Sequence, residues 1–219
     1  MFKSLSISEC GELFGWSPRA AMEILQQIDF EVFPDLAPGH YGRIEDWEEK
    51  WTRLPDAGRI LATSDGKAVG YWSFAPLSPK QREKFEDGIF YDTDMQISDL
   101  PGLSSDSGNF IYISAVVIRE SFRTSIALRH LYRSFFDQLT KLAERDIFID
   151  MIYANAFSAE GERMCQHAGA KRLSLHSDQG VVYALSMFPF PGGLPFTRFG
   201  ELRSSYLTED RRRRGILGQ

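Results

Sequence analysis

The segment FIYISAVVI, residues 110–118, decides the fold of this chain of 219 residues. It is apolar on both faces, as a strand in the interior of a sheet must be. The polar turn RESFRTS, residues 119–125, follows directly. Apolar residues then recur at helical spacing from Leu128 to Leu142 and predict an amphipathic helix. A second strand, Ile147–Ala154, comes next, so this part of the chain predicts a right-handed parallel strand–helix–strand crossover.

Two helices and a hairpin are predicted upstream of the crossover. Apolar residues at helical spacing follow Ser17-Pro18, a favourable helix start, and recur from Ile44 to Leu54. The stretch Asp29–Pro34 between these helices is expected to be a connector. The apolar segments Arg59–Thr63 and Ala68–Phe74 flank an Asp-Gly pair, which is a strong signal for a β-hairpin.

The remaining elements complete a mixed sheet. A helix is expected at about Ala159–Ala168, and strands at Lys171–Leu175 and Val181–Met187. The stretch Pro76–Gly108 is polar and irregular apart from a short helix near Pro79–Phe85, and a segment of this kind often lines a site. The predicted fold class is α/β (α+β), with a mixed, mostly antiparallel sheet, a central parallel crossover and helices on both faces.

The composition changes once, near Pro189. The sequence FPGGLP, residues 190–195, cannot continue a central strand or a helix. We therefore expect residues 1–188 to form one domain. Residues 189–219 form a Pro/Gly-rich extension whose end carries the basic run Arg211–Arg214.

Composition and charge exclude several classes of protein. Hydrophobic residues make up 43% of the chain, which excludes wholesale disorder. With a net charge of −5, from 25 basic and 30 acidic residues, nucleic acid is not expected as a partner. No apolar run is long enough to span a membrane. The two cysteines are too few for a disulfide framework, so a cytoplasmic location is expected. No metal site is expected, because the four histidines show no ligand spacing: His40, His130, His167 and His176.

Three segments resemble the GNAT superfamily of acyl-CoA-dependent N-acyltransferases. They are the strand Phe110–Ile118, the turn Arg123–Ala127, and the run from Tyr153 through Asn155 to the helix that ends His167-Ala168-Gly169-Ala170. The resemblance covers roughly Glu23 to Met187. It implies a GNAT-like fold and an enzyme that moves an acetyl or related acyl group from acyl-CoA to an amine, by direct transfer without a covalent intermediate.

The resemblance also implies an acyl-CoA site at the end of the central strand. Unpaired N–H groups at the start of the following helix attract the pyrophosphate of coenzyme A. The family usually has glycine in this turn, whereas here Ser125 or Ile126 stands in its place, and hydroxyls and Arg123 are expected to compensate. The expected cofactor-binding residues are Val116, Val117, Ile118, Arg123, Thr124, Ser125, Ile126, Ala127 and Asn155.

The transfer requires a group that removes a proton from the amine. The central strand carries no carboxylate, so the base is expected in the connector where the family's acceptor approaches. Glu31 is the candidate we assign, and Asp29 is its alternative. Asp92 and Asp94 in the long irregular stretch are weaker candidates.

The leaving thiolate must also receive a proton. The resemblance aligns Cys165 with the tyrosine that often donates this proton in the family. A buried cysteine is more often a small apolar core residue, so both roles stay open. Tyr153 is a second candidate, and Tyr112 is a third.

Two functions from different classes remain open at the sequence level. In the first, the chain is an N-acyltransferase whose acceptor is a small-molecule amine or a protein amine. In the second, it is a catalytically weak or inactive GNAT-fold module that binds a ligand and acts through a partner, which the turn without glycine permits. A homodimer is compatible with either function, since the Pro/Gly-rich extension could cross to a neighbour.

Overall fold

The computed structural model describes residues 2–35, 38–106, 108–192, 194 and 199–215, which fall into two compact units. Unit 1 comprises residues 1–75, 91–99 and 114–135, and unit 2 comprises residues 76–90, 100–113 and 136–219. The strand β4 (Asn109–Ile118) passes from unit 2 into unit 1 between Ile113 and Ser114. Among the described residues, no helix combines the length and apolar character that a membrane span requires.

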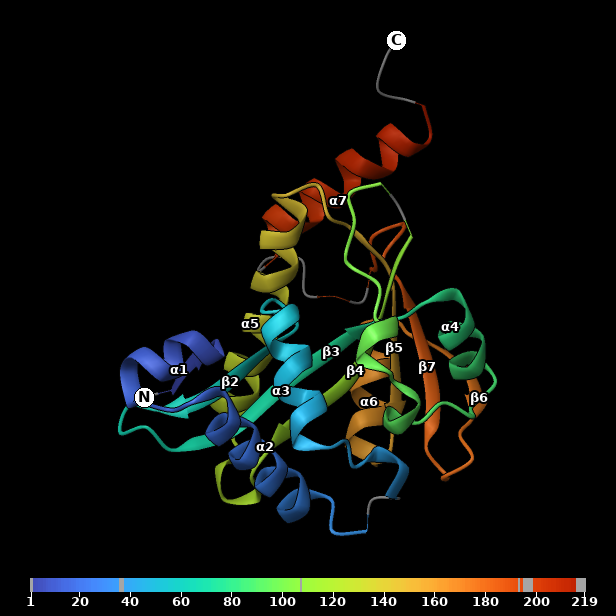
Figure 1. The fold of residues 1–219 in the computed structure, drawn as a ribbon. Helices are drawn as coiled ribbons and strands as arrows, with labels where there is room; N and C mark the ends of the chain where they lie inside the picture. The colour runs from blue at the N-terminus through green and yellow to red at the C-terminus, as the bar shows by residue number, and fades with distance from the viewer. Residues whose placement is uncertain (1, 36–37, 107, 193, 195–198, 216–219) are drawn as a thin grey trace. The chain divides into compact units, whose positions relative to one another are not determined.

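A seven-stranded sheet has the strand order β1-β2-β3-β4-β5-β7-β6 (Figure 1). Strands β4 and β5 pair in parallel, and β1–β2, β2–β3, β5–β7 and β6–β7 pair antiparallel. This topology confirms the predicted fold class. The strands besides β4 are β1 (Phe2–Leu5), β2 (Gly58–Thr63), β3 (Ala68–Pro76), β5 (Ile149–Ala156), β6 (Lys171–Leu175) and β7 (Val181–Ser186). The α-helices are α1 (Ile7–Phe14), α2 (Pro18–Val32), α3 (Ile44–Arg53), α4 (Pro79–Glu86), α5 (Ser125–Ala143), α6 (Ala159–Ala168) and α7 (Gly200–Arg213).

In unit 1, strand β3 is covered on both faces. Successive side chains of a strand point to opposite faces. Tyr71 accordingly packs with the buried residues of α2, whereas the Trp72 indole N–H donates to Ser134 of α5 at 2.8 Å. Gly70 is required where β3 and β4 meet, because a Cβ there would lie 2.3 Å from the Val117 carbonyl oxygen.

In unit 2, helices α6 and α7 cover different parts of the sheet. Cys165 of α6 packs against Ala156 and Tyr183 on one face of β5 and β7. Tyr206 of α7 is buried, and its hydroxyl oxygen accepts a hydrogen bond of 2.9 Å from the N–H of Ile149, the first residue of β5. The extension predicted from Pro189 onward therefore contains a helix that packs into unit 2.

The structure corrects the predicted connector between the first two long helices. Asp29 and Glu31 lie within α2, which continues to Val32. The helix continues because Ile28 and Asp29 are both buried, so packing outweighs the acidic composition of the segment. The strand β1 and the helix α7 were not predicted, since β1 is short and α7 has no clear apolar stripe.

The Tyr206 contact predicts a specific loss of stability. Tyr206→Phe leaves the buried Ile149 N–H without an acceptor, so we expect the free energy of unfolding to fall by about 1–3 kcal/mol. Chemical denaturation measures this change. Ser204→Ala, at an exposed position of the same helix, is the control and is expected to stay within about 0.5 kcal/mol. Equal unfolding free energies for Tyr206→Phe and the native chain would contradict the contact.

Candidate functional site

A buried polar cluster lies between α2, α3 and the strands of unit 1. The ammonium of Lys50, on α3, donates to the Ser73 hydroxyl at 2.9 Å and to the Ser114 hydroxyl at 3.5 Å. Ser73 lies on β3 and Ser114 on β4, and their hydroxyl oxygens are 3.1 Å apart. Nearby, the Tyr71 hydroxyl donates to both carboxylate oxygens of Asp29, at 2.6 and 2.7 Å. Helix α3 thus extends a lysine from its buried side onto the neighbouring strands β3 and β4.

Burial shifts the pKa values of two groups in this cluster, Asp29 and Lys50, toward neutral pH. Burial raises the pKa of the Asp29 carboxyl to about 7, a change that the Tyr71 hydrogen bond opposes and nearby Asp92 reinforces. Burial also lowers the pKa of the Lys50 ammonium to about 8, although Asp92 and Asp29 favour its charged form. Perturbed titratable groups of this kind are concentrated at functional sites. The cluster is therefore the candidate proton-transfer site of unit 1.

The segment from Tyr91 to Asp94 adds a second carboxylate to this cluster. Asp92 Oδ2 lies 3.7 Å from Nδ1 of the buried His40. Its Oδ1 atom is buried and has no hydrogen-bond donor among the described residues. The predicted candidates Asp29 and Asp92 are thus brought together, since each influences the proton affinity of Lys50.

Sequence analysis missed four members of the cluster: Lys50, Tyr71, Ser73 and Ser114. One signal was present, because Lys50 falls on the apolar stripe of its helix, next to Trp51. A charged residue on the buried side of a helix requires buried partners.

The end of β4 and the start of α5 leave several predicted cofactor residues open to solvent. Val116 keeps 42% of its surface exposed although β4 is an interior strand, and Ile126 keeps 57%. Thr124 caps α5, because its hydroxyl accepts from the Ala127 N–H at 3.2 Å. The first N–H groups of the helix, those of Ser125 and Ile126, precede the capped amide and lie at exposed positions.

The remaining predicted residues of this region differ in their surroundings. Val117 and Ile118 are buried. Arg123 is exposed, and its Nε donates to the Ile118 carbonyl oxygen at 3.1 Å, so the arginine folds back over the strand end. Glu31 is exposed on α2 and forms an ion pair with Arg119.

In unit 2, Asn155 carries a carboxamide whose two polar atoms are buried. Neither its Oδ1 nor its Nδ2 has a partner among the described residues. Gly180 faces it closely, because a Cβ at this glycine would lie 2.1 Å from Asn155 Oδ1. A buried carboxamide that bonds to nothing in the protein has the capacity to donate to and accept from a ligand.

The two candidate acids of unit 2 lie on opposite faces of the sheet. Tyr153 donates its hydroxyl proton to Glu86, and burial raises its pKa well above the usual range. Cys165 packs on the other face, beside Ala156, and burial raises the pKa of its thiol to about 11. Tyr112 is buried against Phe85. Tyr153 and Cys165 therefore cannot donate a proton to a leaving group at the same position.

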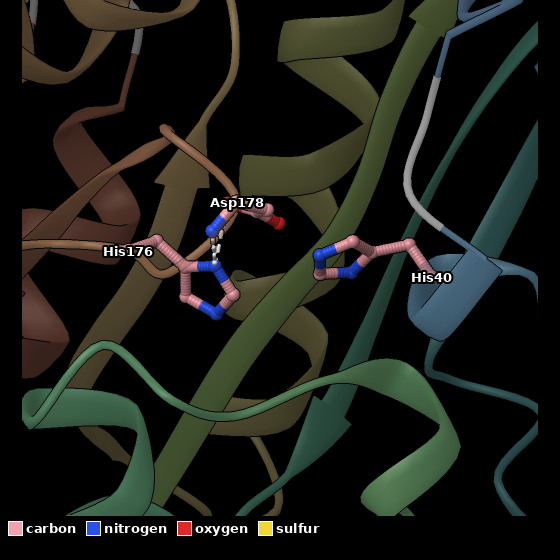
Figure 2. Close-up of side chains that lie close together, drawn as sticks. All are labelled: His40, His176 and Asp178. Atoms are coloured by element: carbon pink, nitrogen blue, oxygen red, sulfur yellow. Dashed lines mark hydrogen bonds and ion pairs between the residues drawn. The ribbon is translucent and has the colours of Figure 1, made fainter.

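The turn between β6 and β7 is organised by His176 and Asp178 (Figure 2). Nδ1 of the buried His176 lies 2.5 Å from Asp178 Oδ1, and Nε2 lies 2.8 Å from the Phe90 carbonyl oxygen. Asp178 in turn accepts from the Gly180 N–H at 3.1 Å. Both ring nitrogens thus have protein partners in unit 2, and the pair holds the turn that presents Gly180 to Asn155.

Comparison with solved structures decides the fold. The loading GNATL domain of CurA from Lyngbya majuscula is 15% identical, with a TM-score of 0.52 over 86% of this chain and 98% of that chain. A mosquito arylalkylamine N-acetyltransferase-like 5b is 12% identical, with a TM-score of 0.52 over 85% and 99%. The chain has the GNAT fold. The GphF GNAT-like decarboxylase in complex with isobutyryl-CoA is a third such structure, 11% identical, with a TM-score of 0.52 over 85% and 98%. No protein-family model and no curated protein matches the sequence.

The pKa of Asp29 predicts a pH dependence of stability. Its folded value of about 7 exceeds the ordinary value of 3.8, so between these values the folded state binds more protons than the unfolded state. We therefore expect the Asp29 contribution to the free energy of unfolding to decrease as pH rises from about 4 to about 7. Subtracting the denaturation curves of Asp29→Asn from those of the native chain isolates this contribution.

The matched control is Glu49→Gln, which removes one carboxylate from an exposed position of α3. The decisive quantity is the free energy of unfolding of the native chain minus that of Asp29→Asn. If this difference stays constant or rises between pH 4 and 7, the raised pKa of the buried Asp29 carboxyl is contradicted.

Proposed function

We propose that this chain is an acyl-CoA-dependent N-acyltransferase that moves an acetyl or related acyl group directly to an amine. One observation carries the proposal: the buried cluster of unit 1 reaches β4 at Ser114, two residues before the exposed Val116. The GNAT resemblance implies that the thioester carbonyl falls near Val116–Ile118, at the end of this strand. A group with a pKa near 7 and the proposed carbonyl position thus belong to one unit.

The first turn of α5 supports acyl-CoA as the co-substrate. The helix has 19 residues and begins at exposed positions. Its unpaired N–H groups and its dipole favour a phosphate group. Because the cap uses the Ala127 amide, the amides of Ser125 and Ile126 are the ones proposed to meet the diphosphate. The family's glycine lets the backbone of this turn approach a phosphate closely. In the proposed complex the exposed positions of Ser125 and Ile126 provide that access without a glycine.

Within unit 2, the Asn155 side chain has polar groups that suit an amide-bearing ligand such as pantetheine. Pantetheine carries secondary amides, each with one donor and one acceptor, and the Asn155 carboxamide offers the complementary pair. Without a ligand, the protein leaves both groups of this side chain unsatisfied, which is costly in a buried position. The residue predicted from sequence thus has the chemistry that the proposed ligand requires.

Acyl-CoA supplies an activated thioester carbonyl to the reaction. In the proposed transfer, a neutral amine attacks this carbon and a C–N bond forms. The C–S bond then breaks, and the proton that the nitrogen still carries in excess passes to the leaving sulfur, so that coenzyme A departs as the thiol. The Asp29 carboxylate takes the proton that the ammonium form of the acceptor must lose. Asp29 is a stronger candidate than Glu31 because burial raises its pKa to about 7, whereas Glu31 is exposed and paired with Arg119.

Cofactor binding is tested by thermal unfolding with acetyl-CoA, which raises the melting temperature if it binds the folded chain. We expect Ser125→Glu to weaken binding at least tenfold by repelling the diphosphate. Glutamate at a helix start stabilises the helix, so the melting temperature without ligand should not fall. Lys141→Glu, about 24 Å further along the same helix, is the charge control. No acetyl-CoA shift in the native chain would overturn the proposal.

Catalysis is tested by thiol release from acetyl-CoA with a panel of amines. We expect Asp29→Asn to lower kcat by roughly 100-fold or more while the acetyl-CoA melting shift is retained. In the native chain, kcat should rise with pH through about 7, as Asp29 loses its proton. Glu31→Gln is the matched comparison, and loss of activity in that variant alone would assign the base to Glu31.

The alternative is a ligand-binding or regulatory module on the same fold. The turn without glycine and the hydrogen bond that engages the Tyr153 proton favour it. An acetyl-CoA melting shift without thiol release toward any amine would support this module over the enzyme.

A further inference from the structure

A groove of about 520 Å³ lies in unit 2, and neither candidate base, Asp29 or Glu31, is among its lining residues. This volume is in the range of small-molecule sites. The groove is lined by the end of α4, by the strands β5, β6 and β7, and by the segment 189–192. All of its lining residues belong to unit 2, so it can be analysed within that unit.

The strand register sets the width of the groove. Tyr153 of β5 pairs with Ala184 of β7, and Ala184 pairs with Lys171 of β6. Directly paired residues of antiparallel strands project on the same face. Tyr153 and Lys171 therefore flank Ala184 with their Cα atoms about 10 Å apart, twice the spacing between neighbouring strands. The small side chain of Ala184 leaves a low floor between two long ones.

One flank carries a carboxylate beside an arginine, and the other carries a lysine. On one flank, Glu86 Oε1 accepts the hydrogen bond from Tyr153, and Arg82 Nε lies 3.6 Å from the same oxygen. Glu86 Oε2 has no donor within the described part of the chain, and 43% of the side chain is exposed. On the other flank, Lys171 is exposed and forms no ion pair with any described residue. The groove thus presents a positioned carboxylate opposite an available ammonium.

Apolar side chains line the rest of the groove. Met151 of β5 contributes to it, and Leu173 of β6 keeps 37% of its surface exposed. Phe190 and its neighbouring prolines form another part of the lining. An apolar group of a ligand would remove this surface from water, which stabilises the complex.

We propose that this groove binds a free α-amino acid with an apolar side chain. The ammonium of the amino acid pairs with Glu86, its carboxylate pairs with Lys171, and its side chain packs against Leu173 and Phe190. Each of these two pairs is a charge-assisted hydrogen bond, which is stronger than one between neutral groups. A ligand without a carboxylate would leave Lys171 without a partner, and one without an ammonium would leave Glu86 Oε2 without a donor.

The binding test uses L-leucine and L-phenylalanine as probes, with thermal unfolding and calorimetry as readouts. At ten times the dissociation constant, a bound amino acid should raise the melting temperature by about 3–6 °C. N-acetyl-L-leucine, which lacks the ammonium, and L-leucinamide, which lacks the carboxylate, should bind at least tenfold more weakly. Equal binding of these derivatives, or no binding of either amino acid, would overturn the proposal.

The variants Glu86→Gln and Lys171→Met should each weaken L-leucine binding at least tenfold, since each removes one charge partner. Lys141→Met, an exposed lysine elsewhere in unit 2, is the matched control and should bind as the native chain does. Far-UV circular dichroism confirms that each variant is folded. Native affinity in Lys171→Met would overturn the assignment. The readout does not use acyl-CoA, so its outcome is independent of the proposed transferase activity.

Discussion

The rest of the structure depends on β4, a strand that must satisfy its backbone inside a sheet. From Phe110 to Ile118 it carries no charged residue, so exposing either face of the strand to solvent would cost free energy. Its first half pairs with β5 in unit 2, and its second half lies in unit 1 with β3 and the cluster around Lys50. Each unit is therefore built around one half of the same strand.

Ser114 interrupts the apolar character of β4 within unit 1, and its hydroxyl accepts a hydrogen bond from the buried Lys50 ammonium. A buried ammonium costs several kcal/mol unless hydrogen bonds and opposite charges compensate it. Lys50 obtains two hydroxyl acceptors and two nearby carboxylates. The compensation is partial, because burial still lowers the pKa of Lys50 and raises that of Asp29. A cluster balanced in this way exchanges protons near neutral pH, and this property makes it a candidate for chemistry rather than for stability.

Sequence analysis succeeded where one periodic pattern determined an element. The crossover from β4 through α5 to β5, the hairpin of β2 and β3, and the pair β6 and β7 all follow from apolar spacing and turn residues. It failed at Asp29–Val32, where an acidic composition suggested a connector but packing of Ile28 and Asp29 continues the helix. It also missed α7, because that helix is buried through few residues, chiefly Leu202 and Tyr206.

The sequence by itself determined the fold class and the course of the chain from β4 into α5, because both depend on local spacing along one strand and one helix. Only the tertiary structure decided that Asp29 is buried while Glu31, two residues away, is exposed. It also decided that Lys50 meets Ser73 and Ser114, which are far away in the sequence. Proton affinity depends on burial and on neighbouring charges in three dimensions, and the order of residues along the chain contains neither quantity directly.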